Sequence, residues 1–307
     1  MHVSFVTTLL SSLVVHGNDD GWAEANVRAF YQTLSAAGYN VVLSAPVQNQ
    51  SGTGSSDAPA KPLTKPGQYD SVPSGASAQG ANSTDRESKF LTGTSWKLTE
   101  CILARLNYVN SYPVTAIKYG TATLAPKFFG GAPDIVVTGP NLGNNLGSTT
   151  KISGTVGAAT EAVKEGIPAI AFSGQSGSGR SYTTLKPGDQ SFVYAQVAQK
   201  LVAALTATAK PWLPTGVGLN VNFPAISSTC ASVNDFKFVL TSIYKDSSRT
   251  DVETCGNDGH LPDESSVLSK SGKCYVTVSV FNANKLDASA EQQAAVLAKL
   301  SPLLTCS

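Results

Sequence analysis

Charged side chains are scarce in this chain of 307 residues, and neither sign dominates. They make up 14% of the sequence, and 22 Lys and Arg against 21 Asp and Glu leave a net charge of +1. A protein that binds a nucleic acid polymer neutralises many phosphates with a basic face. This chain has no basic excess from which to build such a face, so we expect no nucleic acid polymer among its partners.

Histidine is rare, and the cysteines lack the spacing of a metal site. With three histidines and five cysteines that form no CxxC pair, a zinc centre has few ligands to draw on. The GxSxG elbow, the GxxxxGK[ST] phosphate loop and an Asp-x-Asp nucleophile motif are missing as well. These absences argue against the common serine hydrolases, phosphate-loop enzymes and zinc enzymes.

No apolar run is long enough to cross a membrane, and we expect no membrane partner. The run from Val3 to Val15 fits the apolar part of a secretory signal peptide, and Val15 and Gly17 are small enough for cleavage after residue 17. Alternatively, residues 12–17 form the first strand of an uncleaved protein. Both interpretations stay open at this point, and we expect an extracellular, secreted protein.

The cysteines that are present lie mostly near the C-terminus. Four of the five fall between residues 230 and 307, which is typical of a locally cross-linked region in an oxidising compartment. The sequence does not give their pairing. Cys101 falls in an apparent helix over residues 96–109, and we expect it to be a buried free thiol.

Apolar β-branched segments alternate with helical patterns, which favours a parallel sheet with crossover helices. Val27, Phe30, Tyr31 and Leu34 recur at helical spacing after Asp20. Further helices are predicted near Ser153 and over 191–209, and strands over 39–46, 134–139, 169–174 and 217–224. A polar stretch over 48–88 is typical of loops with a short hairpin. We therefore predict an α/β fold with a mainly parallel sheet.

The last third of the chain has a different pattern. "FKFVLTSIY" and "CYVTVSVF" alternate in the manner of antiparallel strands, and a closing helix is predicted near 288–303. We therefore divide the chain after the first 17 residues into a core over 18–225 and an extension over 226–307. The extension is predicted to contain a β-hairpin and a helix.

The adjacent carboxylates Asp19 and Asp20 follow the first apolar run and precede a helix. Asp residues are common in turns and at helix N-caps, so the pair alone is no more than a turn. Ser51 follows the second predicted strand and Asn141 the strand at 134, however, and strand ends of an open α/β sheet meet at one crevice. These four side chains offer the oxygen ligands that a hard divalent cation prefers.

A glycine-rich segment, "TGPNLGNNLGSTTKISGTVGAA", supplies a second element of a site. Ser153, Gly154 and Thr155 open a predicted helix whose N–H groups suit a phosphate. The simpler alternative is that the glycines allow tight turns and that Ser153 or Thr155 caps the helix. A cation beside such a helix end is the arrangement expected for phosphoryl transfer.

Five ordered motifs, "NDDG", "SAPVQNQSG", "VTGPNLGNNLG", "ISGTVGAA" and "LNVNFP", resemble the SurE family over residues 18–225, and more weakly near 265–280. The resemblance implies a Rossmann-like three-layer core and a metal-dependent 5′-nucleotidase or acid phosphatase. It implies one divalent cation, Mg²⁺ or Mn²⁺, and a homodimer or homotetramer built through the C-terminal segment. The implied metal ligands are Asp19, Asp20, Ser51 and Asn141, and the implied phosphate-facing residues are Asn145, Ser153, Gly154 and Thr155.

The hypothesis from the sequence is hydrolysis of a small phosphomonoester, such as a nucleoside monophosphate, by a metal-activated water. Asp19 and Asp20 are the catalytic candidates, and Asn18 and Gly52, each next to a proposed metal ligand, are added as substrate-binding candidates. One alternative is a non-catalytic secreted protein that binds a nucleotide or a phosphate. Another is a nucleoside hydrolase, which also groups aspartates after a first strand.

Overall fold

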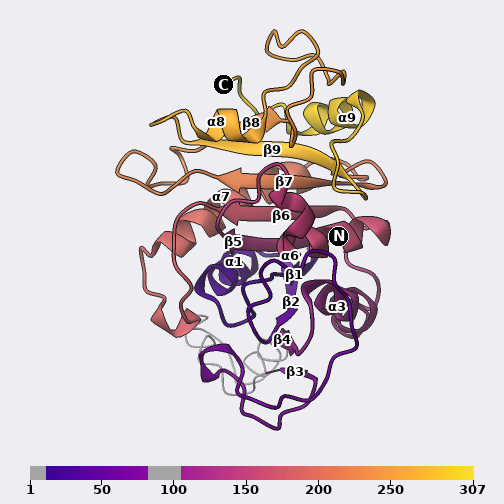
Figure 1. Cartoon of the computed structure of the whole chain (residues 1–307), viewed down its shortest axis with the longest axis vertical. Helices are drawn as coiled ribbons and strands as arrows, with labels where there is room; N and C mark the ends of the chain where they lie inside the picture. Colours follow the sequence, from indigo (N-terminus) through magenta and orange to yellow (C-terminus); the bar gives the residue numbers. More distant parts are fainter. Residues whose placement is uncertain (1–11, 82–104) are drawn as a thin grey trace, which may run out of the picture.

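The computed structural model describes residues 12–81 and 105–307. In this part of the chain nine strands form one sheet in the order β3-β4-β2-β1-β5-β6-β7-β9-β8 (Figure 1). Neighbouring strands are parallel except at the β3/β4 and β7/β9 pairs, which confirms the mainly parallel α/β prediction. The strands are β1 (Leu13–Gly17), β2 (Asn40–Pro46), β3 (Gln79–Ala81), β4 (Leu106–Val109), β5 (Ile135–Leu142), β6 (Ala169–Gly174), β7 (Val217–Phe223), β8 (Lys237–Thr241) and β9 (Tyr275–Asn282).

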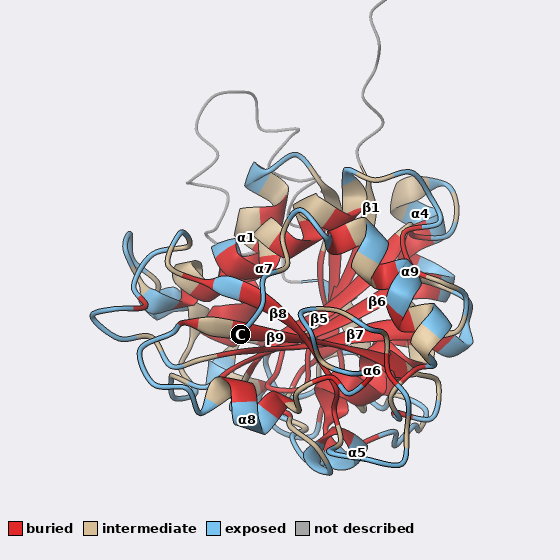
Figure 2. Cartoon of the chain, turned by 90° about the horizontal axis from the view of Figure 1, so that it is seen from above, coloured by how far each residue is buried: buried red, intermediate tan, exposed pale blue. Residues whose placement is uncertain are grey.

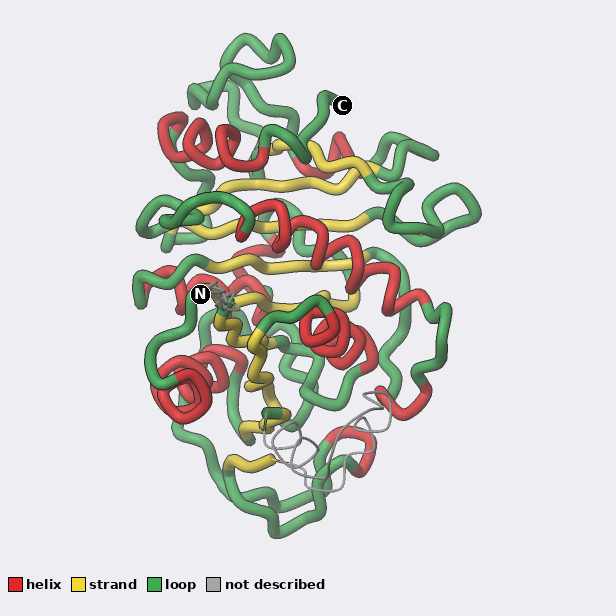
Figure 3. Tube along the Cα trace, turned by 180° about the vertical axis from the view of Figure 1, so that it is seen from behind, coloured by secondary structure: helices red, strands yellow, loops and turns green. Residues whose placement is uncertain are grey.

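Helices cover both faces of this sheet, and together they make three layers (Figure 3). One face packs against α1 (Ala25–Ala36), α7 (Gln190–Thr206) and α9 (Ala290–Leu300), and the other against α3 (Pro113–Tyr119), α4 (Ala125–Phe129) and α6 (Gly154–Lys164). Shorter elements are α5 (Thr149–Ile152), α8 (Glu264–Leu268), the 3₁₀ turns Gln68–Asp70 and Tyr182–Thr184, and the π-turn Gly120–Leu124. None of the helices in the described ranges is long and apolar enough to span a membrane.

The sequence pattern accounts for the main elements. The predicted apolar stripe of α1 is buried, with Val27, Phe30 and Leu34 fully inaccessible. The central parallel strands are buried on both faces (Figure 2), which explains why they read as continuous apolar runs. Glu24 caps α1 by accepting a hydrogen bond from the Asn26 N–H at 2.6 Å.

Strand β1 lies in the interior of the sheet. It pairs in parallel with β2 on one side and with β5 on the other. Val14 and Val15 are completely buried, and so is the His16 side chain. Residues 13–17 are therefore the first strand in this structure, as one of the two interpretations of the N-terminus expected.

Two predictions about secondary structure were wrong. Strands β8 and β9 are parallel neighbours joined by a long crossover, so the C-terminal region holds no hairpin of these strands, and both complete the main sheet. Their apolar alternation indicated strands correctly, but alternation carries no information about direction. Residues 106–109, expected at the end of a helix, form β4, while Cys101 lies outside the described residues.

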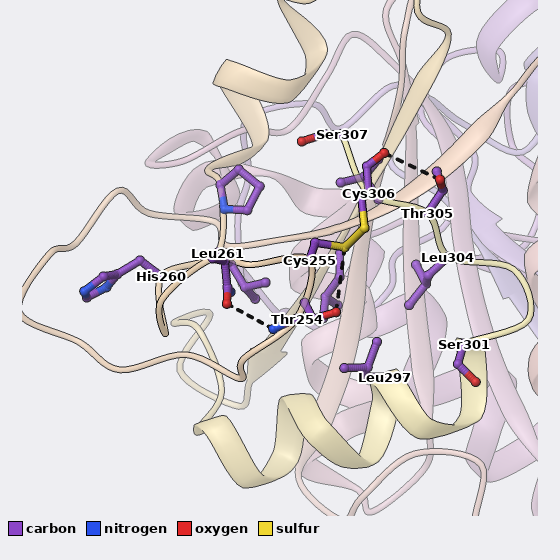
Figure 4. Close-up of a pocket in the computed structure, with 14 residues that line it drawn as sticks. Thr254, Cys255, His260, Leu261, Leu297, Ser301, Leu304, Thr305, Cys306 and Ser307 are labelled. Atoms are coloured by element: carbon purple, nitrogen blue, oxygen red, sulfur yellow. Dashed lines mark hydrogen bonds between the residues drawn. A yellow bond between two sulfur atoms is a disulfide. The ribbon is translucent and has the colours of Figure 1, made fainter.

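Two disulfides cross-link the C-terminal region, as its cysteine content predicted. Cys230 bonds to Cys274, and Cys255 bonds to Cys306. Figure 4 shows the second bridge tying the C-terminal tail to the loop that precedes α8. The tail also runs beside the edge strand, because the Thr305 N–H donates to the Phe238 carbonyl at 2.8 Å.

Candidate metal and phosphate site

The adjacent carboxylates lie in the turn between β1 and α1, at the carboxyl ends of the central strands. Each of the two side chains is 2% exposed, so water does little to solvate them. The Asp19 carbonyl accepts a hydrogen bond from the Gln50 N–H at 2.7 Å, which fixes this turn against the loop after β2. The fold therefore brings two predicted segments together at the crevice where ligands of open α/β sheets bind.

Asp19 is held by the first turn of α6. Its Oδ1 accepts from the Thr155 hydroxyl at 2.6 Å, and its Oδ2 accepts from the Thr155 backbone N–H at 3.0 Å. The Thr155 hydroxyl also lies 3.4 Å from Asn141 Oδ1. A carboxylate oxygen of Asp19 and the amide oxygen of Asn141 therefore both lie next to the Thr155 hydroxyl.

A bulge in β5 directs Asn141 toward this point. The register with β6 shifts between Thr138 and Asn141. Gly139 has a φ of +92°, and a Cβ at that position would lie 2.1 Å from the Phe172 carbonyl oxygen, so the bulge requires glycine. The Asn141 amide donates to the Gly143 carbonyl at 2.7 Å, which leaves its oxygen turned to Thr155.

Asp20 is positioned by two other segments. Its Oδ2 accepts from the Leu142 N–H at 2.8 Å, and its Oδ1 lies 3.5 Å from the Ser51 hydroxyl. Ser51 is exposed, and its N–H donates to the Asn49 side chain at 2.8 Å. The four predicted metal ligands, Asp19, Asp20, Ser51 and Asn141, are therefore gathered at one place.

The charges of the two aspartates are not balanced by basic side chains. Burial raises the pKa of Asp19, and burial together with the nearby Asp19 charge raises the pKa of Asp20 well above its usual range. Among the described residues no Lys or Arg forms an ion pair with either carboxylate. The described part of the chain holds no group of three His, Cys, Asp or Glu side chains that could bind a metal ion by themselves. The candidate ligands Asp19, Asp20, Ser51 and Asn141 offer only oxygen atoms, which suit a hard cation better than zinc.

The start of α6 differs from the open phosphate cradle expected from the sequence. Ser153 is its N-cap as predicted, and the Ser153 hydroxyl accepts from the Val156 N–H at 3.1 Å. The Thr155 N–H already donates to Asp19, so the helix end is occupied by a carboxylate of the protein itself. The Ser153 hydroxyl hydrogen remains able to donate to a ligand.

The remaining predicted substrate residues fall in three different environments. Asn18 is 1% exposed, and its amide oxygen and nitrogen lack hydrogen-bond partners in the described ranges, which leaves both for a ligand. Gly52 lies in an exposed turn, with no other atoms near the position of a Cβ. Asn145 is buried, and its amide donates to the hydroxyl of Ser173, the register partner of Asn141, at 2.8 Å.

Sequence reasoning missed the residues that hold Asn145. The Asn222 side chain accepts from the Asn145 N–H at 2.8 Å, and the Asn220 amide donates to the Asn145 carbonyl at 2.9 Å. Asn220 and Asn222 are two apart on β7, so they point to the same face of the sheet. The signal was present in "LNVNFP", where two Asn residues alternate with buried apolar ones.

Close packing at Gly154 gives a test of this geometry. A Cβ there would lie 2.8 Å from Asp19 Cβ and 3.0 Å from Asp19 Oδ2, so Gly154→Ala must displace the carboxylate. We expect a loss of about tenfold or more in kcat/KM for phosphomonoester hydrolysis and a higher half-saturating Mn²⁺ concentration. The matched control is Gly131→Ala, where nothing lies near the added Cβ. Equal activity of the two variants would contradict the placement of Asp19.

Comparisons with known proteins agree with the fold. The family described as Survival protein SurE matches residues 14–249. An acid phosphatase of Yarrowia lipolytica is 33% identical, over 87% of this chain and 78% of that protein. The 5′-nucleotidase SurE of Lawsonia intracellularis is 31% identical, over 68% of this chain and 65% of that protein. The crystal structure of a SurE protein from Aquifex aeolicus superposes with a TM-score of 0.55 at 21% identity, covering 88% of this chain and 93% of that chain, and it shares the fold.

Proposed function

Because this chain belongs to the SurE family, we propose that it is a phosphatase that hydrolyses phosphomonoesters, including nucleoside monophosphates, with one divalent cation, Mg²⁺ or Mn²⁺. The observation that carries the proposal is the buried pair Asp19 and Asp20, which lacks a basic partner in the described residues but has a hydroxyl and an amide oxygen beside it. Two buried carboxylates without compensation cost several kcal/mol, so the arrangement favours a bound cation.

Asp19, Asp20, Ser51 and Asn141 would hold this cation. When bound, it would make a water molecule more acidic and screen the charge of the phosphate. Both oxygens of Asp19 accept hydrogen bonds from Thr155, so Asp19 is the more rigidly fixed carboxylate. Within the described ranges Asp20 Oδ1 has only the long contact with Ser51, so it is the oxygen best placed to orient the attacking water.

Beside the aspartates, the described residues offer two uncharged donors for the phosphate. The Ser153 hydroxyl can donate to a phosphate oxygen while its lone pair accepts from Val156. The Asn18 amide, buried and without a partner in the described part of the chain, can donate a second hydrogen bond. Binding would therefore depend mainly on the cation, and phosphate affinity should fall sharply when a chelator removes it.

The experiment is an assay of AMP and p-nitrophenyl phosphate with Mg²⁺, Mn²⁺ or EDTA, in which released phosphate and released base are both measured. We expect phosphate release that depends on the cation and no release of adenine. Release of adenine would instead support the nucleoside hydrolase alternative. Binding of AMP in a thermal-shift assay without turnover would support the non-catalytic alternative.

We also propose that the protein is secreted and assembles as a homodimer or homotetramer. The disulfides Cys230–Cys274 and Cys255–Cys306 support an oxidising compartment. The C-terminal region is the proposed contact between subunits. Light scattering on the purified protein tests the oligomeric state, and analysis of the culture medium tests secretion.

A further inference from the structure

A layer of buried polar side chains separates the loop that follows Asn141 from the C-terminal strands. Asn220 on β7 stands in register with Ser279 on β9, and Ser279 in register with Thr241 on β8. The Ser279 and Thr241 hydroxyls are 2.7 Å apart. Glu264 of α8 belongs to the same layer, and all four side chains are at most 1% exposed. Each hydrogen bond in a buried polar layer of this kind matters, because the cost of an unpaired group is high.

The Asn145 backbone connects this polar layer to the loop through hydrogen bonds. Its carbonyl accepts from the Asn220 amide at 2.9 Å and from the Asn222 amide at 3.2 Å. Its N–H donates to the Asn222 side-chain oxygen at 2.8 Å. These three bonds fix the middle of a loop that has Asn141 at one end and α5 at the other.

Glu264 sets the orientation of the Asn220 amide. The Asn220 nitrogen donates one hydrogen to Asn145 and the other to Glu264 Oε1, at 2.7 Å. The Asn220 oxygen has no partner in the described ranges, so no other bond holds this side chain in place. Without the acceptor at Glu264, the Asn220 amide is free to rotate, and the Asn145 carbonyl then keeps only the longer bond from Asn222.

The surroundings of Glu264 favour its neutral form. Burial raises the pKa of Glu264 to about 8, against the opposing hydrogen bond from the Asn220 amide, and the Asp287 charge raises it further. Glu264 Oε2 has no hydrogen-bond partner in the described ranges. Asp287 itself lies 3.4 Å from Arg249.

Other titratable groups on the elements around Glu264 are farther along those elements. Lys237 and Tyr275 are the first residues of β8 and β9, four positions before Thr241 and Ser279. Asp263, next to Glu264, caps α8 through the Ser266 N–H at 3.0 Å. No ion pair to Glu264 is found within the described residues.

We propose that Glu264 is a positioning residue for the phosphatase site, and that its carboxyl group holds the loop over residues 141–147 in place through Asn220 and Asn145. The inference rests on the proposed function for its catalytic consequence. The structural part of the proposal, that a side chain from the C-terminal region holds this loop, does not depend on that function. Ionisation of Glu264 would place an unpaired negative charge in the buried layer and loosen the loop.

The test compares Glu264→Gln, Glu264→Ala and the exposed control Glu291→Gln on α9. Gln keeps an acceptor for Asn220 and cannot ionise, whereas Ala removes the acceptor. We expect Glu264→Ala to raise KM by about tenfold or more with a smaller change in kcat, and Glu264→Gln to restore KM. Amide hydrogen exchange over residues 142–147 should be faster in the Ala variant than in the Gln variant.

The pH dependence separates positioning from a merely structural role. From about pH 6 to about pH 9, the ratio of wild-type to Glu264→Gln kcat/KM should fall by about tenfold, because only the wild-type side chain ionises. A ratio that does not change with pH, or equal hydrogen exchange in the Gln and Ala variants, overturns the proposal. If Glu264→Ala does not fold, the pH dependence of the ratio of wild-type to Glu264→Gln kcat/KM still tests the proposal. If the wild-type protein lacks activity with every cation, the proposed function is wrong. Hydrogen exchange over residues 142–147 then tests by itself whether Glu264 holds the loop.

Discussion

Asp19→Asn and Asp20→Asn should each reduce cation-dependent phosphate release by about 10³-fold or more, since about 4 kcal/mol of charge stabilisation is lost. At Asp19, the single oxygen of Asn would accept from the Thr155 N–H, and its nitrogen would donate to the Thr155 hydroxyl, which now donates to Asp19. At Asp20, its oxygen would accept from the Leu142 N–H and its nitrogen would donate to the Ser51 hydroxyl. The substitutions therefore remove charge with little change in shape.

The same variants should become more stable when no cation is present. Repulsion between the two buried carboxylates, which raises the pKa of Asp20, is relieved in either variant. We expect a higher melting temperature in EDTA than for the wild-type protein, and no further rise when Mn²⁺ is added. The wild-type protein should be stabilised by Mn²⁺, since a ligand that binds only the folded state raises its stability.

Asp246→Asn is the matched control, because Asp246 is exposed in a surface turn and bonds to Ser248. It should leave both activity and the effect of Mn²⁺ unchanged. Cation-dependent turnover that persists in Asp19→Asn and Asp20→Asn would show that the metal site is elsewhere. A wild-type protein that binds Mn²⁺ without releasing phosphate would identify the non-catalytic alternative.

The parallel core was predictable because its strands are buried on both faces. Runs such as 134–139 and 169–174 are apolar and β-branched without alternation, and they became β5 and β6. Direction was not predictable for the C-terminal strands, because it depends on where the chain between β8 and β9 crosses over. The short β4 was missed because its four residues, Leu106–Val109, continue an apparently helical pattern.

The candidate metal ligands could be chosen from the sequence because each follows a predicted strand. What the sequence could not show is how they are held. The contact between Asp19 and Thr155 joins residues 136 positions apart, and the contact between Asn220 and Glu264 joins two segments that read as separate units. Long-range hydrogen bonds between buried polar side chains depend on the packing of the whole sheet and leave little local pattern.

A chain that begins at Asn18 should fail to fold. It lacks β1, which pairs with β2 and β5 and buries Val14, Val15 and His16. Burial of the two valines alone contributes about 1.5 to 3 kcal/mol each, and a typical domain is stable by only about 5 to 15 kcal/mol. Loss of the backbone pairing on both sides adds to this, so circular dichroism should show no cooperative thermal transition.

A chain that begins at Ser12 is the control, because it keeps all of β1 and the bond from the Asn40 N–H to the Ser12 carbonyl at 3.0 Å. It should fold and retain the activity of the 307-residue chain. A folded, active chain that begins at Asn18 would contradict the assignment of β1 as an essential strand. Residues 13–17 support Asp19 and Asp20 as part of β1, so N-terminal sequencing of active protein should find a start before Leu13.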